Sequence, residues 1–444
     1  MLPSLLRIAR VPFVRDVATM QVGRMVSIGC NFLSSILYAR FLGIGGYGSY
    51  AVILAFTGVF GLITNLGQQM TLTTFLAEAW GRQDKNAMRE ISHYYILLSL
   101  GTALLMGILM LIAPWLTERI YGDPIMGTLA RLVFLSSMFE FVFSFFAVAL
   151  QTVREIRLLA FLENAKTVVQ LAAATIFLIL GYEVAGVLWS SVIAAGTFFV
   201  LSLLLFPRFR ARHDFPHLRE MLRPMPWKKL WKYSKDGIWI AVDKSIGNLY
   251  PNIFLFILSM QASTGIVGLI RLAFKLADLP SAVGLNSISR MASSALSAMS
   301  GNAELLRKNF LRLTRHTIFV HGTISAAAMI LVPVFLPLVY GQEFSVAAYP
   351  FLVIVVLHIL NGLHTSVIPI LRLHSKIYIA TLMNLFSMGI AIGLFFVFEP
   401  ELGSTRALYI GLAVYHVLIS SILWPTLQLL RERTLHSHST RTIS

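Results

Sequence analysis

The chain consists mostly of long apolar runs separated by short polar breaks. Because crossing the hydrocarbon core of a bilayer takes about 20 helical residues, each uncharged run of that length is a candidate membrane span. A membrane-spanning backbone must satisfy its own hydrogen bonds, so we expect every span to be a helix. The about twelve expected spans cover residues 18–41, 48–74, 91–116, 125–150, 160–181, 184–206, 235–258, 263–283, 314–338, 347–371, 377–398 and 405–427.

Composition supports the same class of protein. The chain is 57% hydrophobic and only 13% charged, and no polar segment is long enough to fold as a domain outside the bilayer. Cys30 is the single cysteine and lies in an apolar run, which excludes an intramolecular disulfide and a cysteine-rich metal site. The expected fold class is therefore an all-α polytopic membrane protein.

One stretch, residues 207–235, is strongly basic and is called the basic segment below. Its cations are Arg208, Arg210, Arg212, Arg219, Arg223, Lys228, Lys229, Lys232 and Lys235, against Asp214 and Glu220 as the only acids. Four prolines in it prevent a single straight helix. We interpret the segment as a cytoplasmic bridge between two membrane-embedded halves.

The bridge suggests a division of the chain. We expect an N-terminal six-helix bundle over residues 1–206, a basic cytoplasmic linker over 207–234, a C-terminal six-helix bundle over 235–428 and a disordered cytoplasmic tail over 429–444. Since six spans are an even number, both halves enter the membrane from the same side. Two such halves are expected to be parallel repeats, an architecture typical of transporters.

The net charge of +16 follows the positive-inside rule. One set of alternate loops contains Arg82, Lys85, Arg89, Arg154, Arg157, the basic segment, Arg307, Lys308, Arg312, Arg315, Arg372, Lys376, Arg431 and Arg433. The opposite set contains Glu118, Asp123, Glu183, Glu343, Glu399 and Glu401. The alternation explains the excess charge without nucleic acid as a partner, and it predicts that both termini are cytoplasmic.

Charged residues within the spans need a specific reason, because a charge at mid-membrane costs about 2.5–3.5 kcal/mol. Arg24 lies about two turns into the first span and either snorkels to the surface or serves as a cavity cation for a phosphate. In the seventh span Lys244, Asn248 and Asn252 recur every four residues. They form one polar stripe on a helix, which we expect to line a cavity.

The eighth span carries Arg271, Lys275 and Asp278 on one face. Asp243 of the seventh span falls at nearly the same depth as Lys275, so we expect an ion pair between them. Asp278 has two alternative partners, Lys275 and Lys244. Either arrangement leaves Arg271 as the cation with the least obvious counter-charge.

The first half contains one isolated carboxylate. Glu140 lies in the middle of the fourth span and is either a neutral buried acid, a member of an ion pair, or a group that couples transport to protons or sodium. Glu163 and Lys166 open the fifth span and can pair with each other at i and i+3. We interpret the histidines of the spans as packing or interfacial residues.

Signals of catalysis are missing from the sequence. There is no GxxxxGK[ST] phosphate-binding loop, which argues against an intrinsic ATPase, and no HExxH zinc motif. The expected external loops are short, whereas membrane enzymes of polysaccharide assembly commonly carry catalytic residues on a sizeable one. We therefore expect no enzyme activity, no catalytic residue, no metal and no cofactor.

Residues 31–78 read NFLSSILYARFLGIGGYGSYAVILAFTGVFGLITNLGQQMTLTTFLAE. They resemble the first helical hairpin of the polysaccharide-exporter or O-antigen flippase (Wzx-type) family, in the superfamily that also contains lipid II flippases and MATE drug exporters. The matching positions are Ala39, Arg40, Leu42, Gly43, Tyr47, Gly48, Tyr50, Leu66, Gly67, Phe75, Leu76, Ala77 and Glu78. Ile44, Gly45 and Gly46 stand where members often have a proline and an acid.

The resemblance implies two six-helix bundles around a central cavity, lined largely by the first and seventh helices. It also implies export of a lipid-linked oligosaccharide by alternating access. By helix count, Arg24 and Arg271 resemble cavity arginines in the first and eighth helices of lipid II flippases.

The expected function is thus a flippase for an undecaprenyl-pyrophosphate-linked oligosaccharide in a bacterial inner membrane. We expect substrate contacts from Arg24, Lys244, Asn248, Arg271 and Lys275. Coupling to a proton or sodium gradient is assigned to Glu140, Asp243 and Asp278.

Two alternatives to this function stay open. They are a MATE-type drug/ion antiporter, against which the cationic residues of the eighth span argue, and a membrane enzyme of polysaccharide assembly. Membrane lipids and other polysaccharide-assembly proteins are further expected partners. The basic segment either binds lipid and substrate phosphate or only sets topology.

Overall fold

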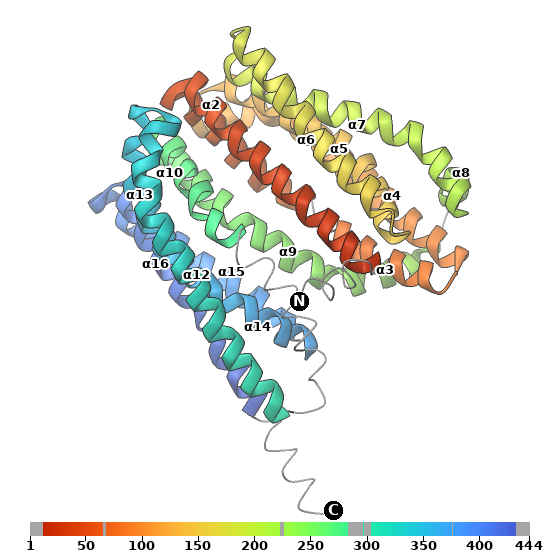
Figure 1. Ribbon diagram of the computed structural model, residues 1–444. Helices are drawn as coiled ribbons and strands as arrows, with labels where there is room; N and C mark the ends of the chain where they lie inside the picture. The colour runs from red at the N-terminus through yellow and green to blue at the C-terminus, as the bar shows by residue number, and fades with distance from the viewer. Residues whose placement is uncertain are drawn as a thin grey trace, which may run out of the picture. The chain divides into compact units, whose positions relative to one another are not determined.

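The computed structural model describes residues 12–64, 68–222, 226–282, 296, 303–374 and 376–431. The regular elements in these ranges are helices, and no strand occurs among them (Figure 1). The chain divides into two compact units, Met1–Ser245 and Ile246–Ser444. The predicted two-bundle, all-α fold is therefore confirmed.

The first unit is a bundle of long helices. They are α2 (Pro12–Thr64), α3 (Gln68–Gly81), α4 (Lys85–Tyr121), α5 (Pro124–Thr152), α6 (Ile156–Ile179), α7 (Glu183–His213), the short α8 (Leu218–Met221) and the start of α9 (Trp227–Gln261). Helices α4, α5, α7 and α6 pack in that order, each against the next, and α2 packs on α6. Figure 1 shows these five long helices running alongside one another.

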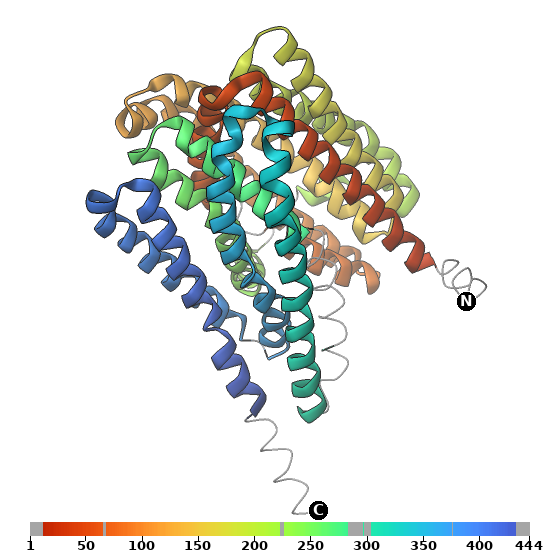
Figure 2. The same cartoon turned by 60° about the vertical axis from the view of Figure 1, so that its left-hand side comes forward.

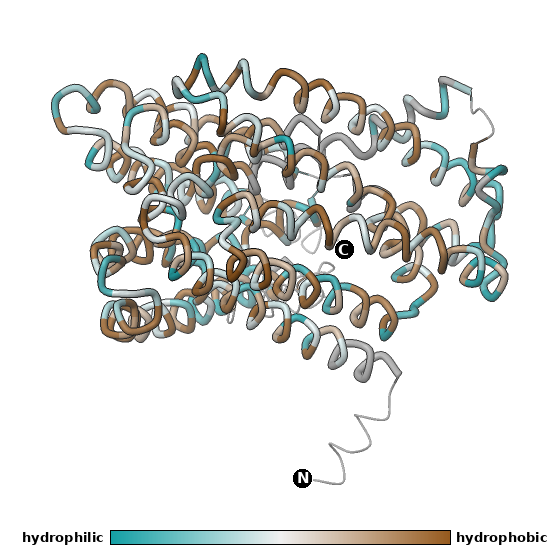
Figure 3. The backbone as a smooth tube through the Cα atoms, turned by 90° about the horizontal axis from the view of Figure 1, so that it is seen from above, coloured by the Kyte–Doolittle hydropathy of each residue, from teal (hydrophilic) through white to brown (hydrophobic). Residues whose placement is uncertain are grey.

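Nine helices of the described ranges are long and apolar enough to cross a membrane. The first, Thr19–Gly61, covers the first expected span and the start of the second, and the other eight each coincide with one. Hydrophobic residues run along the helices, and hydrophilic ones are frequent near their ends (Figure 3). The protein is thus a multi-pass membrane protein, and the total of about twelve spans stays a prediction.

Helix α2 is interrupted at Gly43, where φ is 61° and ψ is −177°. This conformation is essentially restricted to glycine, because a Cβ atom would clash with the neighbouring backbone. The interruption falls between the expected spans 18–41 and 48–74, so it is the turn of the predicted first hairpin. The described part of α2 then ends at Thr64, and α3 covers the end of the second expected span.

The connection between α4 and α5 shows how polar residues end these helices. Gly122 takes a left-handed conformation, and its N–H donates to the carbonyl of Glu118 at 2.9 Å. Asp123 then caps α5 by accepting a hydrogen bond from the N–H of Ile125 at 2.8 Å. A Cβ atom on Gly127 would lie 2.4 Å from the carbonyl oxygen of Ala113, so a glycine lets the two helices approach closely.

The basic segment is largely helical, because α7 continues through Pro207 to His213 before α8 and α9 follow. It packs back on the first unit through aromatic side chains. Phe209 lies edge-on to Phe146 of α5, with ring centroids 5.5 Å apart, and Phe215 is at the same distance from Phe209. All three are buried.

Ion pairs add to this packing. Asp214 pairs with Lys85, Glu155 lies 3.4 Å from Arg212 and 3.2 Å from His213, and Glu90 pairs with Lys229. Exposed pairs contribute only about 0–1 kcal/mol each, so the aromatic burial supplies most of the attachment. The pKa of the Tyr233 phenol is raised, mainly because the side chain is buried and to a smaller extent because the carboxylates of Glu90 and Asp84 lie near it.

The second unit contains the rest of α9 and the remaining helices. They are α10 (Thr264–Ala277), α12 (Ala303–Tyr340), the 3₁₀ helix η2 (Gln342–Ala347), α13 (Ala348–His358), α14 (Asn361–Leu373), α15 (Ile377–Leu402) and α16 (Ser404–Ser420). Helices α15 and α16 lie side by side (Figures 1 and 2), and α13 packs against α10, α12 and α16.

Two features of the second unit differ from the uniform spans expected there. The tenth span, 347–371, is broken into α13 and α14 by a turn at Ile359 and Leu360. Helix α12 begins at Ala303 rather than at residue 314, because its basic first turns continue the helix beyond the apolar run. Pro280 and Gly284 interrupt the eighth span, so the sequence also predicts that it continues as a broken helix through residues 289–300. Those residues lie outside the described ranges apart from Leu296.

We predict that Gly43→Ala destabilises the protein by about 1–3 kcal/mol, the cost of holding a side chain in this backbone region. Thermal unfolding of the purified protein measures the effect as a lowered midpoint. Gly45→Ala is the matched control: Gly45 is helical, and no atom lies within 4 Å of an added Cβ. An unchanged midpoint in Gly43→Ala would contradict the strained turn.

Candidate functional site

The described charges at membrane depth lie in two groups, one in each unit. In the first unit, Arg24 is half-buried on α2. Beside it, the Ser27 hydroxyl donates to Oδ1 of Asn164 on α6 at 3.0 Å. A Cβ atom on Gly23 would lie 2.6 Å from Nδ2 of Asn164, so α2 and α6 meet closely at this level. Among the described residues, no carboxylate pairs with Arg24.

Glu140 of α5 pairs with Lys166 of α6, whose Nζ contacts both carboxylate oxygens. The Lys166 ammonium also lies 5.1 Å from the ring centroid of Phe143. Of the three interpretations of Glu140, the structure thus shows the one in which it is a member of an ion pair. Lys166 turns to Glu140 rather than to Glu163, so the expected i, i+3 pair is not formed.

The second unit contains the two cations of the eighth expected span. Arg271 and Lys275 lie one turn apart on α10, and both are half-buried. Leu272, Ala273 and Phe274 between them are buried, and α10 packs against α13. No described carboxylate pairs with Arg271. An anion beside Arg271 would therefore be stabilised.

Asp278 has a described partner that the sequence did not suggest, and the side chain of Lys244, one of its two expected partners, lies outside the described part of the structure. Asp278 lies at the C-terminal end of α10, where its Oδ1 is 3.3 Å from Nδ1 of His358 on α13. His358 is only 2% exposed, whereas the Asp278 side chain is 60% exposed. The pair therefore joins a buried imidazole to a carboxylate that solvent or a ligand can reach.

His358 belongs to a buried polar cluster that the sequence analysis missed. The Tyr250 hydroxyl hydrogen-bonds with Nε2 of His416 at 2.7 Å, and the rings of His358 and His416 are 5.4 Å apart. Tyr250 stacks on Tyr415 with centroids 4.5 Å apart, and the Tyr415 hydroxyl donates to Asn384 at 2.9 Å. The signal available was the pair Tyr415 and His416, two adjacent polar rings inside an apolar run.

The remaining predicted residues are on α9. Asp243, Lys244 and Asn248 belong to this helix, but their side chains lie outside the described part of the structure. The expected contact between Asp243 and Lys275 also lies outside it. In the described ranges, no group of three or more His, Cys, Asp and Glu side chains could hold a metal ion.

Known proteins were compared with the chain. No curated protein sequence matches it. An inward-facing multidrug resistance MATE family transporter of the MOP superfamily shares 15% identity and a TM-score of 0.66, over 92% of this chain and 99% of that one. Its outward-facing counterpart shares 15% identity and a TM-score of 0.65, over 94% and 96%.

A MOP superfamily transporter from Pyrococcus furiosus, described as having a binding pocket of reverse polarity, gives 14% identity and a TM-score of 0.67, over 94% of this chain and 95% of that one. These likenesses establish a MATE-like fold of two helical bundles. The family model described as "Polysaccharide biosynthesis protein" matches residues 13–293. Since this match spans more than half of the chain, the protein belongs to the polysaccharide biosynthesis protein family.

Proposed function

We propose that this protein is a flippase that moves a polyprenyl-pyrophosphate-linked oligosaccharide across the bacterial inner membrane by alternating access. The observation that carries the proposal is Arg271 on α10, a half-buried cation with no described carboxylate partner, in a chain of this family and fold. A pyrophosphate is an anion that would stabilise it, since arginine binds phosphate oxygens through two parallel N–H groups. Lys275, one turn away, stays a proposed substrate contact.

The depth of Arg271 supports this role. It lies seven residues after Thr264, the first residue of α10, which is about 10 Å along a helix. An arginine placed there without a counter-charge would cost several kcal/mol in hydrocarbon. Water and a phosphate group in a transport cavity would remove that cost. Arg24 of the first unit, which also has no described carboxylate partner, stays a proposed substrate contact.

The MATE-like fold alone does not distinguish this function from drug export. A carrier of cationic drugs requires acidic groups in its cavity, whereas the charges described on α10 upstream of Asp278 are cationic. An anionic lipid-linked substrate therefore fits the described charges better than a cationic drug does. Lys244 and Asn248 of α9 stay proposed substrate contacts.

The first prediction concerns Arg271. Arg271→Ala should abolish surface-polysaccharide export at normal expression, and Arg271→Lys should restore little, since an ammonium lacks the bidentate fork of a guanidinium. The measurement is surface polysaccharide of cells carrying each variant, with membrane content of the protein quantified in parallel. Arg406→Ala, which removes an exposed cation from the first turn of α16, is the control. Normal export by Arg271→Ala would make the arginine structural and end the cationic-site mechanism.

We propose further that protons drive the transport through Asp278. Its carboxylate is exposed and lies beside the buried imidazole of His358, and carboxylates inside membrane spans serve as proton relays in transporters. Glu140 is less suited, because Lys166 neutralises it directly. Asp243 stays a candidate for the same role.

Asp278→Asn should therefore uncouple transport from the proton gradient. In proteoliposomes, the variant should lose uptake driven by a pH gradient and keep substrate exchange in the absence of a gradient. Glu401→Gln, which removes an exposed carboxylate at the end of α15, should behave like the unmodified protein. Full pH-driven uptake by Asp278→Asn, or uptake driven by sodium at constant pH, would remove proton coupling at this residue.

The proposed orientation has both termini in the cytosol. After Cys30→Ser, single cysteines would be introduced by Glu343→Cys in η2 and by Arg219→Cys in α8, two exposed positions. A membrane-impermeant maleimide added to intact spheroplasts should label the first variant and not the second, and permeabilisation should make both reactive. The opposite labelling pattern would reverse the orientation.

A further inference from the structure

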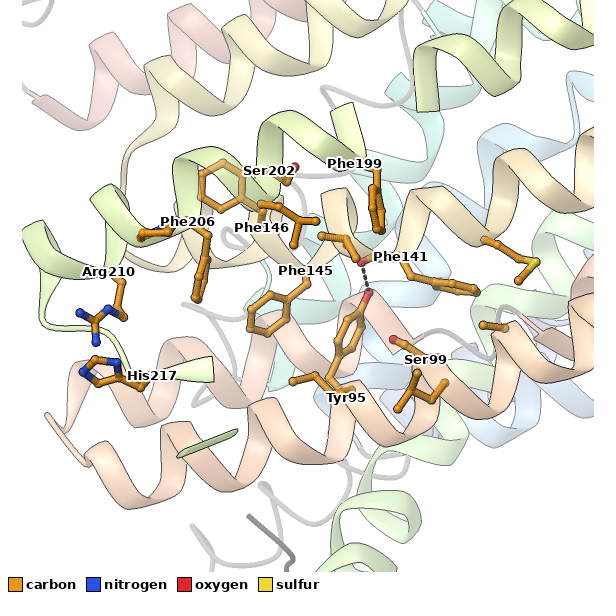
Figure 4. Close-up of a pocket in the computed structure, with 17 residues that line it drawn as sticks. Tyr95, Ser99, Phe141, Phe145, Phe146, Phe199, Ser202, Phe206, Arg210 and His217 are labelled. Carbon is orange, nitrogen blue, oxygen red and sulfur yellow. Dashed lines mark hydrogen bonds between the residues drawn. The ribbon is translucent and has the colours of Figure 1, made fainter. Parts of the chain in front are cut away.

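A large apolar pocket lies in the first unit, away from the charged residues discussed above. It has a volume of about 620 Å³ and lies over α5 between α4 and α7. Figure 4 shows aromatic rings along it, among them Tyr95, Phe145 and Phe199, with Arg210 and His217 together at one end. The pocket is thus an apolar groove with a cationic end.

The groove is on the opposite side of α5 from the Glu140–Lys166 pair. Met138, Phe141 and Phe145 line it, whereas Glu140 follows Met138 by two residues, which is about 200° around a helix. The tyrosine hydroxyl of the groove is satisfied internally, because Tyr95 donates to the carbonyl of Phe141 at 3.4 Å. Apart from the buried hydroxyl of Ser99, which has no described hydrogen-bond partner, the groups that would favour a polar ligand lie at the cationic end of the groove.

The rim of the groove is apolar and exposed within its unit. Leu100 of α4 is 60% exposed and Leu203 of α7 is 48% exposed, and both line the groove. Both residues belong to helices long and apolar enough to span the membrane. A hydrocarbon chain of the surrounding lipid can therefore reach the groove from the side.

The length of the groove matches one leaflet. On α7 the lining residues run from Phe199 to Arg210, eleven positions that correspond to about 16 Å of helix. Half of a hydrocarbon core about 30 Å thick is about 15 Å. An acyl chain of one leaflet lying along α7 would thus bring its headgroup to the level of Arg210.

Among the described residues Arg210 has no carboxylate partner, whereas Arg212 and His213 share Glu155. The nearby carboxylates are engaged elsewhere: Glu155 with Arg212 and His213, and Asp214 with Lys85. Glu220 accepts a hydrogen bond from the backbone N–H of His217 at 2.8 Å. Within the described ranges no carboxylate pairs with Arg210, which is half-buried at the groove end.

We propose that this groove binds an anionic phospholipid of the leaflet that borders the basic segment, which is the cytoplasmic leaflet in the orientation proposed above. One acyl chain lies on the aromatic side chains between α4 and α7, and the phosphate accepts hydrogen bonds from Arg210 and His217. The lipid is a resident of the first unit and not the transported substrate. The site is independent of the sugar carried and of the coupling ion.

Native mass spectrometry of the purified full-length protein tests the site. The protein is delipidated in detergent and titrated with palmitoyl-oleoyl phosphatidylglycerol or with phosphatidylcholine of the same chains. We expect phosphatidylglycerol to bind about tenfold more tightly, because the choline cation of phosphatidylcholine offsets its phosphate charge and is repelled by Arg210, and we expect Arg210→Ala to remove that preference. Arg208→Ala removes the same charge from the same part of α7 at an exposed position that does not line the groove, and it should retain the preference.

A second variant tests the apolar part of the groove without touching charge. Ala103→Phe places a ring at the deep end and should reduce binding of both lipids about tenfold. Leu104→Phe, at the next position and 69% exposed outside the groove, is its control. The proposal fails if the two lipids bind equally to the unmodified protein, or if neither Arg210→Ala nor Ala103→Phe weakens phosphatidylglycerol. Displacement of phosphatidylglycerol by equimolar undecaprenyl phosphate would also overturn it, by assigning the groove to the substrate chain.

Discussion

A peptide group in hydrocarbon has no water to bond with, and that constraint governs this molecule. Each N–H and C=O must find a partner within its own helix, which is why long uninterrupted helices fill the described part of the chain. Departures from the helix occur at residues that tolerate them, such as Gly43 with its positive φ and Gly122 at the end of α4. Polar side chains at these ends, such as Asp123, then supply the bonds that the helix cannot.

The same medium makes every buried charge costly, and the structure deals with this in three ways. Glu140 and Lys166 neutralise each other across two helices. Asp278 reaches a histidine and keeps its own exposure. Arg24, Arg210 and Arg271 have no described carboxylate, and all three are half-buried. An anionic ligand is stabilised most beside a cation that has no carboxylate partner. For this reason the substrate and the lipid are both proposed to bind at such arginines.

Hydropathy predicted the ends of a helix well where the helix stops at the end of its apolar run. The run 125–150 became α5, Pro124–Thr152, and the glycine turn of the first hairpin lies where expected. Hydropathy identifies the part of a helix that lies in hydrocarbon, however, and not the parts that continue into water. It therefore could not predict that α12 extends back to Ala303 or that α7 continues to His213. Those extensions depend on packing and on ion pairs made in water.

The contacts of the charged side chains were harder to predict. The sequence shows that Glu140 needs a partner. It does not show whether Lys166 pairs with Glu140 or with Glu163 of its own helix, because that depends on how α6 is rotated against α5. Asp278 and His358 are far apart in the chain, and no periodicity links them. Arg271 differs: because its own helix offers only another cation one turn away, the sequence already indicated that it lacks a local counter-charge.

The division between the two units falls at Ser245 and Ile246, inside α9 and not in a loop. The backbone hydrogen bonds of a helix therefore run across this junction. The start of α9 pairs with the first unit through Lys229 and Glu90, and Pro251 lies farther along the same helix. Because proline lacks the N–H of one helical hydrogen bond, α9 bends most easily at that turn.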